Sequence, residues 1–387
     1  MEECVGVENH GHAPHPPKGP VHVQSALTDL DRRSMLAAGV AGIAAFASSN
    51  PANAAQPVVR HPSGATGIID VHTHFVPDAY RSAASAAGHV KPDGMPALPA
   101  WSEAEMLAMM NRLGIGTAIL SISSPGVHFG NDAAARQLAR TVNTEAARLK
   151  SAHPARFGFF ASLPLPDVEG ALAEVTAAFD KLGADGVILE SNSGGIYPGD
   201  PRFDPVYAEL NRRGAVVLLH PTSPHCPGCI QPGPTVPAPV LEFMFETTRA
   251  VTNLVLTRCI ERYPQIRFII PHAGAAMPVL VDRIAMAAAI MPGMAGTSPD
   301  AILATLRKLH FDLAGAPVPR LLTALRSFAD PEHLLYGSDW PFTPEAAVTK
   351  LLARLKVSLA SDGDAQAIFS GNARRLFPQL VEPGTAS

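Results

Sequence analysis

The sequence has little of what marks several common protein classes. It contains 4 Cys in 387 residues, which excludes a small domain held together by a disulfide framework. Its formal net charge is −4, so it offers no excess of positive charge for nucleic acid or an anionic membrane surface. After the first sixty residues, no apolar run reaches the ~20 residues of a membrane span without a charge or a proline, so we expect no span. With 47% hydrophobic and 17% charged residues, the chain is predicted to fold around a large core.

The first 54 residues differ from the rest and are predicted to form a disordered leader. Residues 11–20 mix Gly, Pro and His without an apolar period. Arg32 and Arg33 then precede a short apolar run and the sequence Ala52-Asn53-Ala54. This order is similar to a twin-arginine export signal, which predicts a periplasmic or secreted protein whose mature chain begins near Ala55. The alternative is a cytoplasmic protein with an alanine-rich leader.

From residue 67 onward, short apolar runs alternate with longer amphipathic ones. The apolar runs are nearly continuous rather than alternating with polar residues, as expected for strands of a parallel sheet that are buried on both faces. The predicted strands are 68–71, 117–121, 157–162, 186–189, 216–219, 268–270, 309–312 and 334–336.

Helical patterns fill the intervals between these runs. Helices are predicted over 102–113, 132–150, 167–182 and 204–213, the first with a Ser-x-x-Glu capping box and the others opening near Asp. Gly114, Gly183 and Gly214 follow three of them, where a glycine usually ends a helix. Eight strands alternating with helices predict an α/β fold, a (β/α)₈ TIM barrel, as a single domain over residues 67–378. The alternative, an open doubly wound sheet, lacks its usual glycine-rich phosphate-binding motifs.

Histidine and aspartate stand at the ends of four predicted strands. His72 and His74 end the first strand, His220 the fifth, His272 the sixth and Asp339 the eighth. A TIM barrel builds its active site at the carboxyl ends of its strands, so we expect these side chains to meet. Two histidines spaced by two on a strand point to the same side.

Three imidazoles and one carboxylate suit a divalent metal ion. The predicted ligands are His72, His74, His220 and Asp339, and the predicted ion is Zn²⁺, with Mn²⁺, Fe²⁺ or Co²⁺ as alternatives. His272 is then placed to act as a general acid or base near neutral pH.

At this point the sequence resembles the amidohydrolase superfamily. Within it, the chain is similar to the decarboxylase branch typified by aminocarboxymuconate-semialdehyde decarboxylase, and most similar to 6-methylsalicylate decarboxylase-like proteins. The resembling segments run in order along the chain and include IIDVHTHFVP, HPARFGFFASLPLPD, RRGAVVLLHPTSP, FIIPHAGAAMPVLVDRI and LLYGSDWPFTP.

The resemblance implies a metal-dependent decarboxylase, a carbon–carbon lyase acting on a small aromatic carboxylic acid of the salicylate type. It makes His72, His74, His220 and Asp339 the metal ligands, with His272 and Asp339 as catalytic residues. Binuclear members carry a carboxylated lysine at the end of strand four, where this chain has none, so a single ion is implied. The alternative is a mononuclear metal-dependent hydrolase of a lactone or amide.

Four further residues are candidates for binding the substrate. Glu190 ends the fourth strand, His128 lies in the loop after the second strand, and Trp340 follows Asp339 directly. Arg283 matches an arginine that, in the typifying decarboxylase, reaches the active site of the neighbouring subunit to bind a substrate carboxylate, which implies a homodimer.

The pair Cys226 and Cys229 lies in a proline-rich loop after the fifth strand. Free thiols, a local disulfide and, together with His225, a second metal site all remain open for this pair.

Overall fold

The computed structural model describes residues 67–226, 236–292, 297–361 and 363–380. These residues all belong to the second of two compact units, Ser63–Ser387. The predicted leader over residues 1–54, with its twin-arginine motif, lies outside the described residues, so export of the protein stays a prediction.

Eight parallel strands form one sheet in which each strand pairs with its neighbour along the sequence, from β1 to β8. Backbone hydrogen bonds then join β1 to the segment that directly follows β8: Val71 N donates to Tyr336 O at 3.0 Å and Asp339 N donates to His72 O at 2.7 Å. The sheet therefore curls into a barrel, which confirms the predicted (β/α)₈ fold. The strands are β1 (Ile68–His74), β2 (Ile115–Ser121), β3 (Phe157–Ser162), β4 (Gly186–Glu190), β5 (Val216–His220), β6 (Arg267–Ile270), β7 (His310–Asp312) and β8 (Leu334–Leu335).

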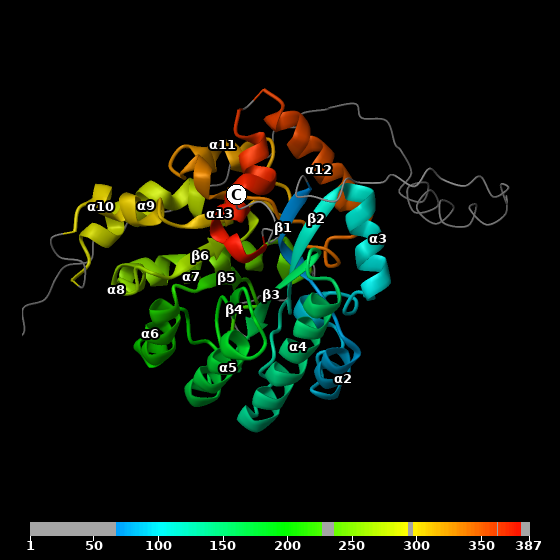
Figure 1. Ribbon diagram of the computed structural model, residues 1–387. Helices are drawn as coiled ribbons and strands as arrows, with labels where there is room; N and C mark the ends of the chain where they lie inside the picture. Colours follow the sequence, from blue (N-terminus) through cyan, green and yellow to red (C-terminus); the bar gives the residue numbers. More distant parts are fainter. Residues whose placement is uncertain (1–66, 227–235, 293–296, 362, 381–387) are drawn as a thin grey trace, which may run out of the picture. The chain divides into compact units, whose positions relative to one another are not determined.

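Helices surround the strands in chain order, so that the chain winds once around the barrel (Figure 1). The described helices are α2 (Asp78–Ala86), α3 (Glu103–Leu113), α4 (Asp132–Ala152), α5 (Val168–Asp180), α6 (Asp204–Arg213), α7 (Glu242–Leu256), α8 (Cys259–Arg262), α9 (Met277–Ala289), α10 (Pro299–Leu306), α11 (Arg320–Arg326), α12 (Glu345–Leu359) and α13 (Asn372–Leu376). None of these is both long enough and apolar enough to span a membrane.

The helix ends follow the local sequence with two differences from expectation. The Ser102 side chain caps α3 by accepting from Glu105 N, and Gly114 ends that helix with φ 73° in the left-handed region. Asn131, rather than Asp132, caps α4. Asp204 is the first residue of α6 rather than its cap, and its carboxylate pairs with Arg262 at 2.7 Å.

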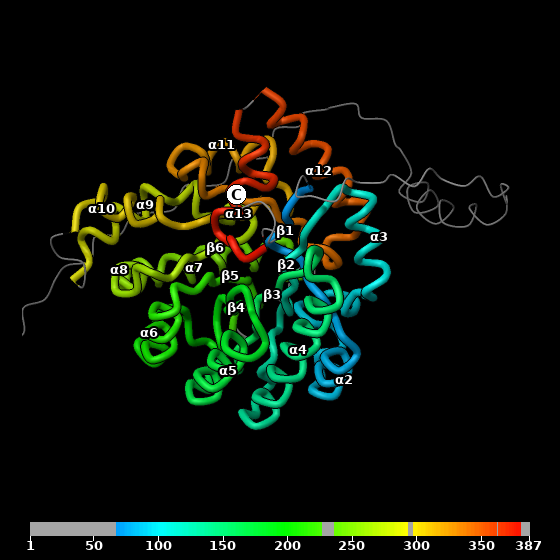
Figure 2. The backbone as a smooth tube through the Cα atoms, viewed as in Figure 1, coloured from blue at the N-terminus to red at the C-terminus, as the bar shows by residue number. Residues whose placement is uncertain are grey.

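The interior of the barrel is a separate apolar cluster, closed at one end by the last helix. Alternate strand residues such as Val71 and Leu218 pack against Ala373, Leu376 and Phe377 at the end of the described chain. In the tube view, α13 lies over the middle of the ring of strands (Figure 2). Since this apolar plug fills the amino-terminal end of the barrel, polar side chains are left to gather at the carboxyl ends of the strands.

Candidate active site

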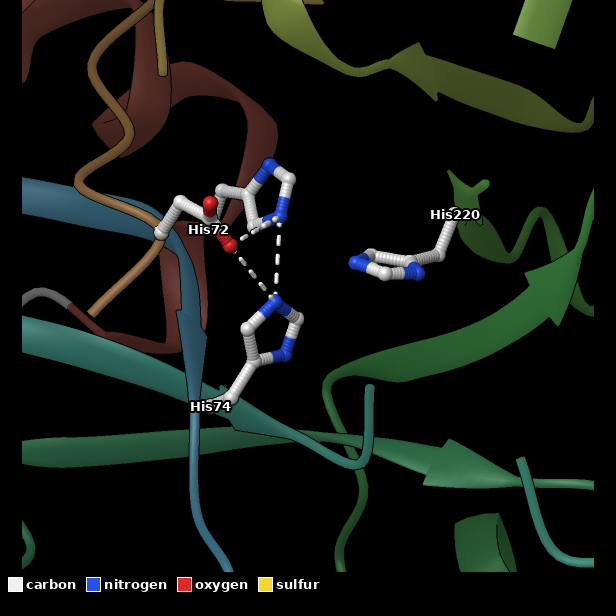
Figure 3. A group of neighbouring side chains, drawn as sticks. His72, His74 and His220 are labelled. Atoms are coloured by element: carbon white, nitrogen blue, oxygen red, sulfur yellow. Dashed lines mark hydrogen bonds and ion pairs between the residues drawn. The ribbon is translucent and has the colours of Figure 1, made fainter. Parts of the chain in front are cut away.

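Four predicted metal ligands meet at the carboxyl ends of the strands. One ligand atom from each of His72, His74, His220 and Asp339 lies within 4.8 Å of the other three. His72 and His74 lie on β1 itself, which extends three residues beyond its predicted end, and His220 is the last residue of β5. Figure 3 shows the rings of His72 and His74 one above the other, with His220 facing them from the opposite side. Asp339 follows β8 and has φ 59°, a strained backbone conformation for a residue other than glycine.

The hydrogen bonds around His72 and His74 fix which ring nitrogens face the centre. His72 Nδ1 lies 2.9 Å from Asp312 Oδ2, an acceptor, so Nδ1 carries the proton. The Ser121 hydroxyl donates to Thr73 O at 3.0 Å, so its oxygen is left to accept from His74 Nδ1 at 2.9 Å. The Nε2 atoms of both rings are therefore the nitrogens that face the centre, and they lie only 3.2 Å apart. Two ring nitrogens at that distance need a cation between them, either a proton on one ring or a metal ion bound to both.

The spacing of the ligand atoms also fits a small divalent ion. His74 Nε2 lies 3.2 Å and His72 Nε2 lies 3.6 Å from Asp339 Oδ1. Tetrahedral bonds of about 2.0–2.1 Å to one zinc ion place neighbouring ligand atoms roughly 3.4 Å apart. The side chains of His72, His74 and Asp339 therefore need little movement to bind such an ion.

The pKa shifts of His74 and His220 also favour metal binding. Burial lowers the pKa of His74 to about 3 and that of His220 to about 4, which keeps these imidazoles neutral, as metal ligands must be. Burial acts in the same direction on His72, but the carboxylates of Asp312 and Asp339 outweigh it and raise the pKa of His72 to about 9. Against the effect of burial, contacts with the histidines hold the pKa of Asp339 well below its usual range. With His72 protonated and Asp339 ionised, the four side chains have no net charge, and a metal ion that binds His72 Nε2 takes the place of that proton.

His272 lies beside this group at the end of β6. It begins the short helical turn η4 (His272–Gly274) with φ 55°, and its Nε2 lies 4.0 Å from Asp339 Oδ2. Burial, reinforced by the positive charge of His72, lowers the pKa of His272 to about 4. A neutral imidazole beside an ionised carboxylate can accept a proton and pass it on.

Asp312, which the sequence did not single out, connects two parts of this site. Its Oδ2 accepts from His72 Nδ1, and its Oδ1 accepts from the backbone N–H groups of His272 at 3.1 Å and Ala314 at 3.0 Å. One buried carboxylate therefore orients a metal ligand and holds the turn that carries His272. Its position at the end of a predicted strand was the one available signal, since nothing in the sequence pairs it with a histidine 240 positions away.

Gly337 leaves the room that His72 needs. A Cβ atom on Gly337 would lie 2.7 Å from His72 Cβ and 3.2 Å from Asp312 Oδ1. A side chain here would push the first ligand out of place.

Two of the predicted substrate-binding residues line one cavity next to the metal group. This β2–β5 cavity has a volume of about 510 Å³ and lies among the loops that follow β2, β3, β4 and β5, with Glu190 and His128 in its wall. Glu190 Oε2 is 3.6 Å from His220 Nδ1, and burial, with the charge of Asp93 adding to it, raises the pKa of Glu190 well above its usual range. Both ring nitrogens of His128 are used locally, Nδ1 by Gly130 N and Nε2 by Asp132 at the start of α4, so only its ring face is open to a ligand.

The other two predicted substrate-binding residues lie elsewhere. The Trp340 side chain is buried in the main core, and its backbone oxygen accepts from His74 N at 2.7 Å. Arg283 lies on the exposed face of α9 and makes no hydrogen bond or ion pair within the described ranges. Cys226 is disulfide-bonded, which excludes a free thiol and a metal-binding role for this residue.

Comparison with known proteins places the chain in a family. A 6-methylsalicylic acid decarboxylase of Aspergillus aculeatus is 39% identical over 324 residues, covering 81% of this chain and 96% of the relative. A crystal structure described as an amidohydrolase II is 38% identical, with a TM-score of 0.73 over 80% of this chain and 99% of its own. A dihydroxybenzoic acid decarboxylase from Polaromonas sp., crystallised with manganese and the inhibitor 2-nitroresorcinol, shares the fold at 20% identity, with a TM-score of 0.67 over 81% and 97% of the two chains. The amidohydrolase family model matches residues 69–379, and the chain belongs to this family.

Proposed function

We propose that the protein is a metal-dependent decarboxylase of a small aromatic carboxylic acid of the salicylate type, such as 6-methylsalicylate. The observation that carries this proposal is the 39% identity to a 6-methylsalicylic acid decarboxylase over 96% of that enzyme's length. The group of His72, His74, His220 and Asp339 supports it, because such a donor set holds one divalent ion. We propose Zn²⁺ as that ion, with Mn²⁺, Fe²⁺ and Co²⁺ as the alternatives.

The reaction breaks the bond between the ring and its carboxylate, releases CO₂ and adds one proton to the ring carbon. The bound metal supplies positive charge that orients the carboxylate and stabilises the electron-rich ring. A proton from water reaches the ring carbon through His272 and Asp339, whose Nε2 and Oδ2 atoms are 4.0 Å apart. Because its pKa is near 4, His272 holds no proton of its own at neutral pH and acts by relaying one. Asp312 keeps the His272 turn in place while this occurs.

The proposal is tested by the mass of the product. Incubating the metal-loaded protein with 6-methylsalicylate should give a product that has lost CO₂. A hydrolase of a lactone or amide would instead give a product that has gained a water molecule from an ester or amide substrate. If the protein releases CO₂ from no member of a panel of hydroxybenzoates, the proposal is contradicted.

We also propose that the protein is a homodimer that uses α9 as an interface. Arg283 shares one face of this helix with Val279, Met286 and Ile290, since these residues are spaced by four, three and four. The three apolar side chains are 73%, 61% and 85% exposed. A row of exposed apolar side chains on one helix face is typical of a surface that contacts another protein. A second copy seated on this stripe would cover them and give Arg283 a partner. Sedimentation of the full chain at twice its 40.6 kDa mass is expected, and a monomer at micromolar concentration would contradict the dimer.

A further inference from the structure

The turn that follows β8 carries Asp339 and returns to it four residues later. Asp339 has φ 59°, which a residue other than glycine adopts only where the surrounding structure holds it. Thr343 N donates to Asp339 O at 2.8 Å and closes the turn. His74 N and the Thr73 hydroxyl donate to Trp340 O at 2.7 Å and 3.0 Å and fix the turn to β1. The backbone of Asp339 is therefore held from both sides.

The carboxylate of Asp339 is held separately, by the hydroxyl of Thr343. The torsion that turns an aspartate carboxylate is broad, so the backbone alone does not decide which oxygen faces the metal group. Thr343 Oγ1 donates to Asp339 Oδ2 at 2.9 Å and removes this freedom. Oδ1 then lies 3.2 Å from His74 Nε2 and 3.6 Å from His72 Nε2. Oδ2 lies on the side of His272, 4.0 Å from its Nε2.

The Thr343 side chain is well suited to fix a direction. Threonine is branched at Cβ, which leaves it few χ1 rotamers. Pro344 follows it, and a proline restricts the backbone of the residue before it. Within the described ranges, the hydroxyl makes this one hydrogen bond, to Oδ2. The contact with Asp339 is therefore the use that the structure makes of this hydroxyl.

We infer that Thr343 is a positioning residue of the metal site: its hydroxyl presents Asp339 Oδ1 to the metal and keeps Oδ2 beside His272. Two effects follow. A ligand oxygen that is already in place binds the metal more tightly, because the carboxylate loses no freedom on binding. Oδ2 is also kept where a proton can pass between it and His272. The second effect rests on the proposed function, whereas the first does not.

Thr343→Val tests the first effect, because valine keeps the shape of threonine and lacks the hydroxyl. The full-length protein is titrated with Zn²⁺ in competition with a fluorescent chelator. Loss of an outer partner of a metal ligand typically weakens metal binding roughly 10- to 100-fold. The Asp339 side chain is 19% exposed, so water partly replaces the lost partner, and we expect the lower end of that range, about tenfold. Thr343→Ala removes the same hydroxyl and should give a similar loss, which guards against a poor fit of valine.

Thr343→Ser separates the hydrogen bond from the packing, since serine keeps the hydroxyl and lacks the methyl group. It should return the zinc affinity to within about threefold of the native value, the remaining loss reflecting the extra rotamers of serine. Thr349→Val is the matched control, because its exposed hydroxyl donates to Glu345 O within α12 at 2.9 Å. This control should leave the zinc affinity unchanged.

The second effect is tested by CO₂ release from 6-methylsalicylate at saturating Zn²⁺, so that every variant is loaded with metal. Thr343→Val should lower kcat about tenfold, because Oδ2 is no longer held beside His272. In His272→Asn, which has already lost the relay, the same substitution should lower kcat by no more than about twofold further. Such non-additivity is expected of a residue that acts through Asp339 on the relay.

Two outcomes would overturn the inference: a zinc affinity of Thr343→Val within about twofold of the native value, or a loss that Thr343→Ser does not restore. Equal effects on kcat with and without His272 would overturn its second part. A protein whose zinc affinity responds as expected but that releases no CO₂ would contradict the decarboxylase proposal alone. One that releases CO₂ while Thr343→Val binds zinc as tightly as the native protein would contradict this inference alone.

Discussion

Replacing Asp312 by asparagine tests how the buried carboxylate orients His72. In the native site, Oδ1 accepts from two backbone N–H groups and Oδ2 accepts from His72 Nδ1. An asparagine can satisfy the two N–H groups only with its carbonyl oxygen, so its NH₂ group must take the place of Oδ2. That group donates, which forces the proton of His72 from Nδ1 to Nε2 and removes the lone pair that faces the metal.

The expected loss follows from this reversal. Removing such an outer partner of a metal-binding histidine typically lowers metal affinity 10- to 100-fold, or about 1.4–2.8 kcal/mol. We expect Asp312→Asn to reach the upper end of this range, since it presents the wrong tautomer rather than merely losing a bond. The fold should survive, because the side chain keeps its shape and its two backbone partners.

Zinc affinity of the metal-free protein, measured by competition with a fluorescent chelator, gives the answer. Asp330→Asn serves as the matched control, because Asp330 is an exposed capping residue before β8 and asparagine caps equally well. A zinc affinity of Asp312→Asn within about twofold of the native value would refute the tautomer reasoning.

Three further predictions concern the relay, the packing and the pH dependence. His272→Asn should retain the metal, measured by elemental analysis, but lower kcat by about 10²–10⁴-fold, and a near-native rate would remove His272 from the relay. Gly337→Ala should lose bound metal because its Cβ would meet His72 at 2.7 Å, whereas Gly363→Ala, where nothing lies within 4 Å, should keep it. Burial, reinforced by His333 and Arg267, lowers the pKa of His310 from 6.5 to about 3, so the unfolded chain binds this proton more readily. His310 should therefore leave the free energy of unfolding unaffected above pH 6.5 and lower it as the pH drops toward 3. In urea titrations, His310→Gln should show a smaller decline of this free energy with falling pH. An equal decline in the native protein and the variant would contradict this prediction.

The sequence predicted the fold well because the two patterns that indicate it, apolar runs for strands and capped amphipathic segments for helices, are both local. All eight predicted strands are confirmed, β3 with the same bounds. Continuous apolar runs that alternate with capped helices are typical of a parallel sheet covered by helices. The errors are at the ends. β1 runs on to His74 because His74 N donates to Trp340 O and Phe75 N, just after the strand, donates to Ser121 O, a tertiary effect that the local pattern does not contain.

The sequence predicted those residues of the site that lie at the ends of strands. His72, His74, His220 and Asp339 were found because a barrel brings strand ends together. Asp312 and Ser121 were not, because their importance lies in hydrogen bonds to residues far away in the sequence, among them the rings of His72 and His74. Residues that line a cavity are equally hard to predict. Asp93, for example, lies in a loop between α2 and α3, where the alternation of strands and helices gives no signal.

The most direct test of the central claim is CO₂ release from 6-methylsalicylate as metal is added back to metal-free protein. The site of His72, His74, His220 and Asp339 predicts that the rate rises in proportion to bound metal and stops rising at one ion per chain. Full CO₂ release by a protein shown to be free of metal would contradict the claim, and so would a metal-loaded protein that leaves the carboxylate in place.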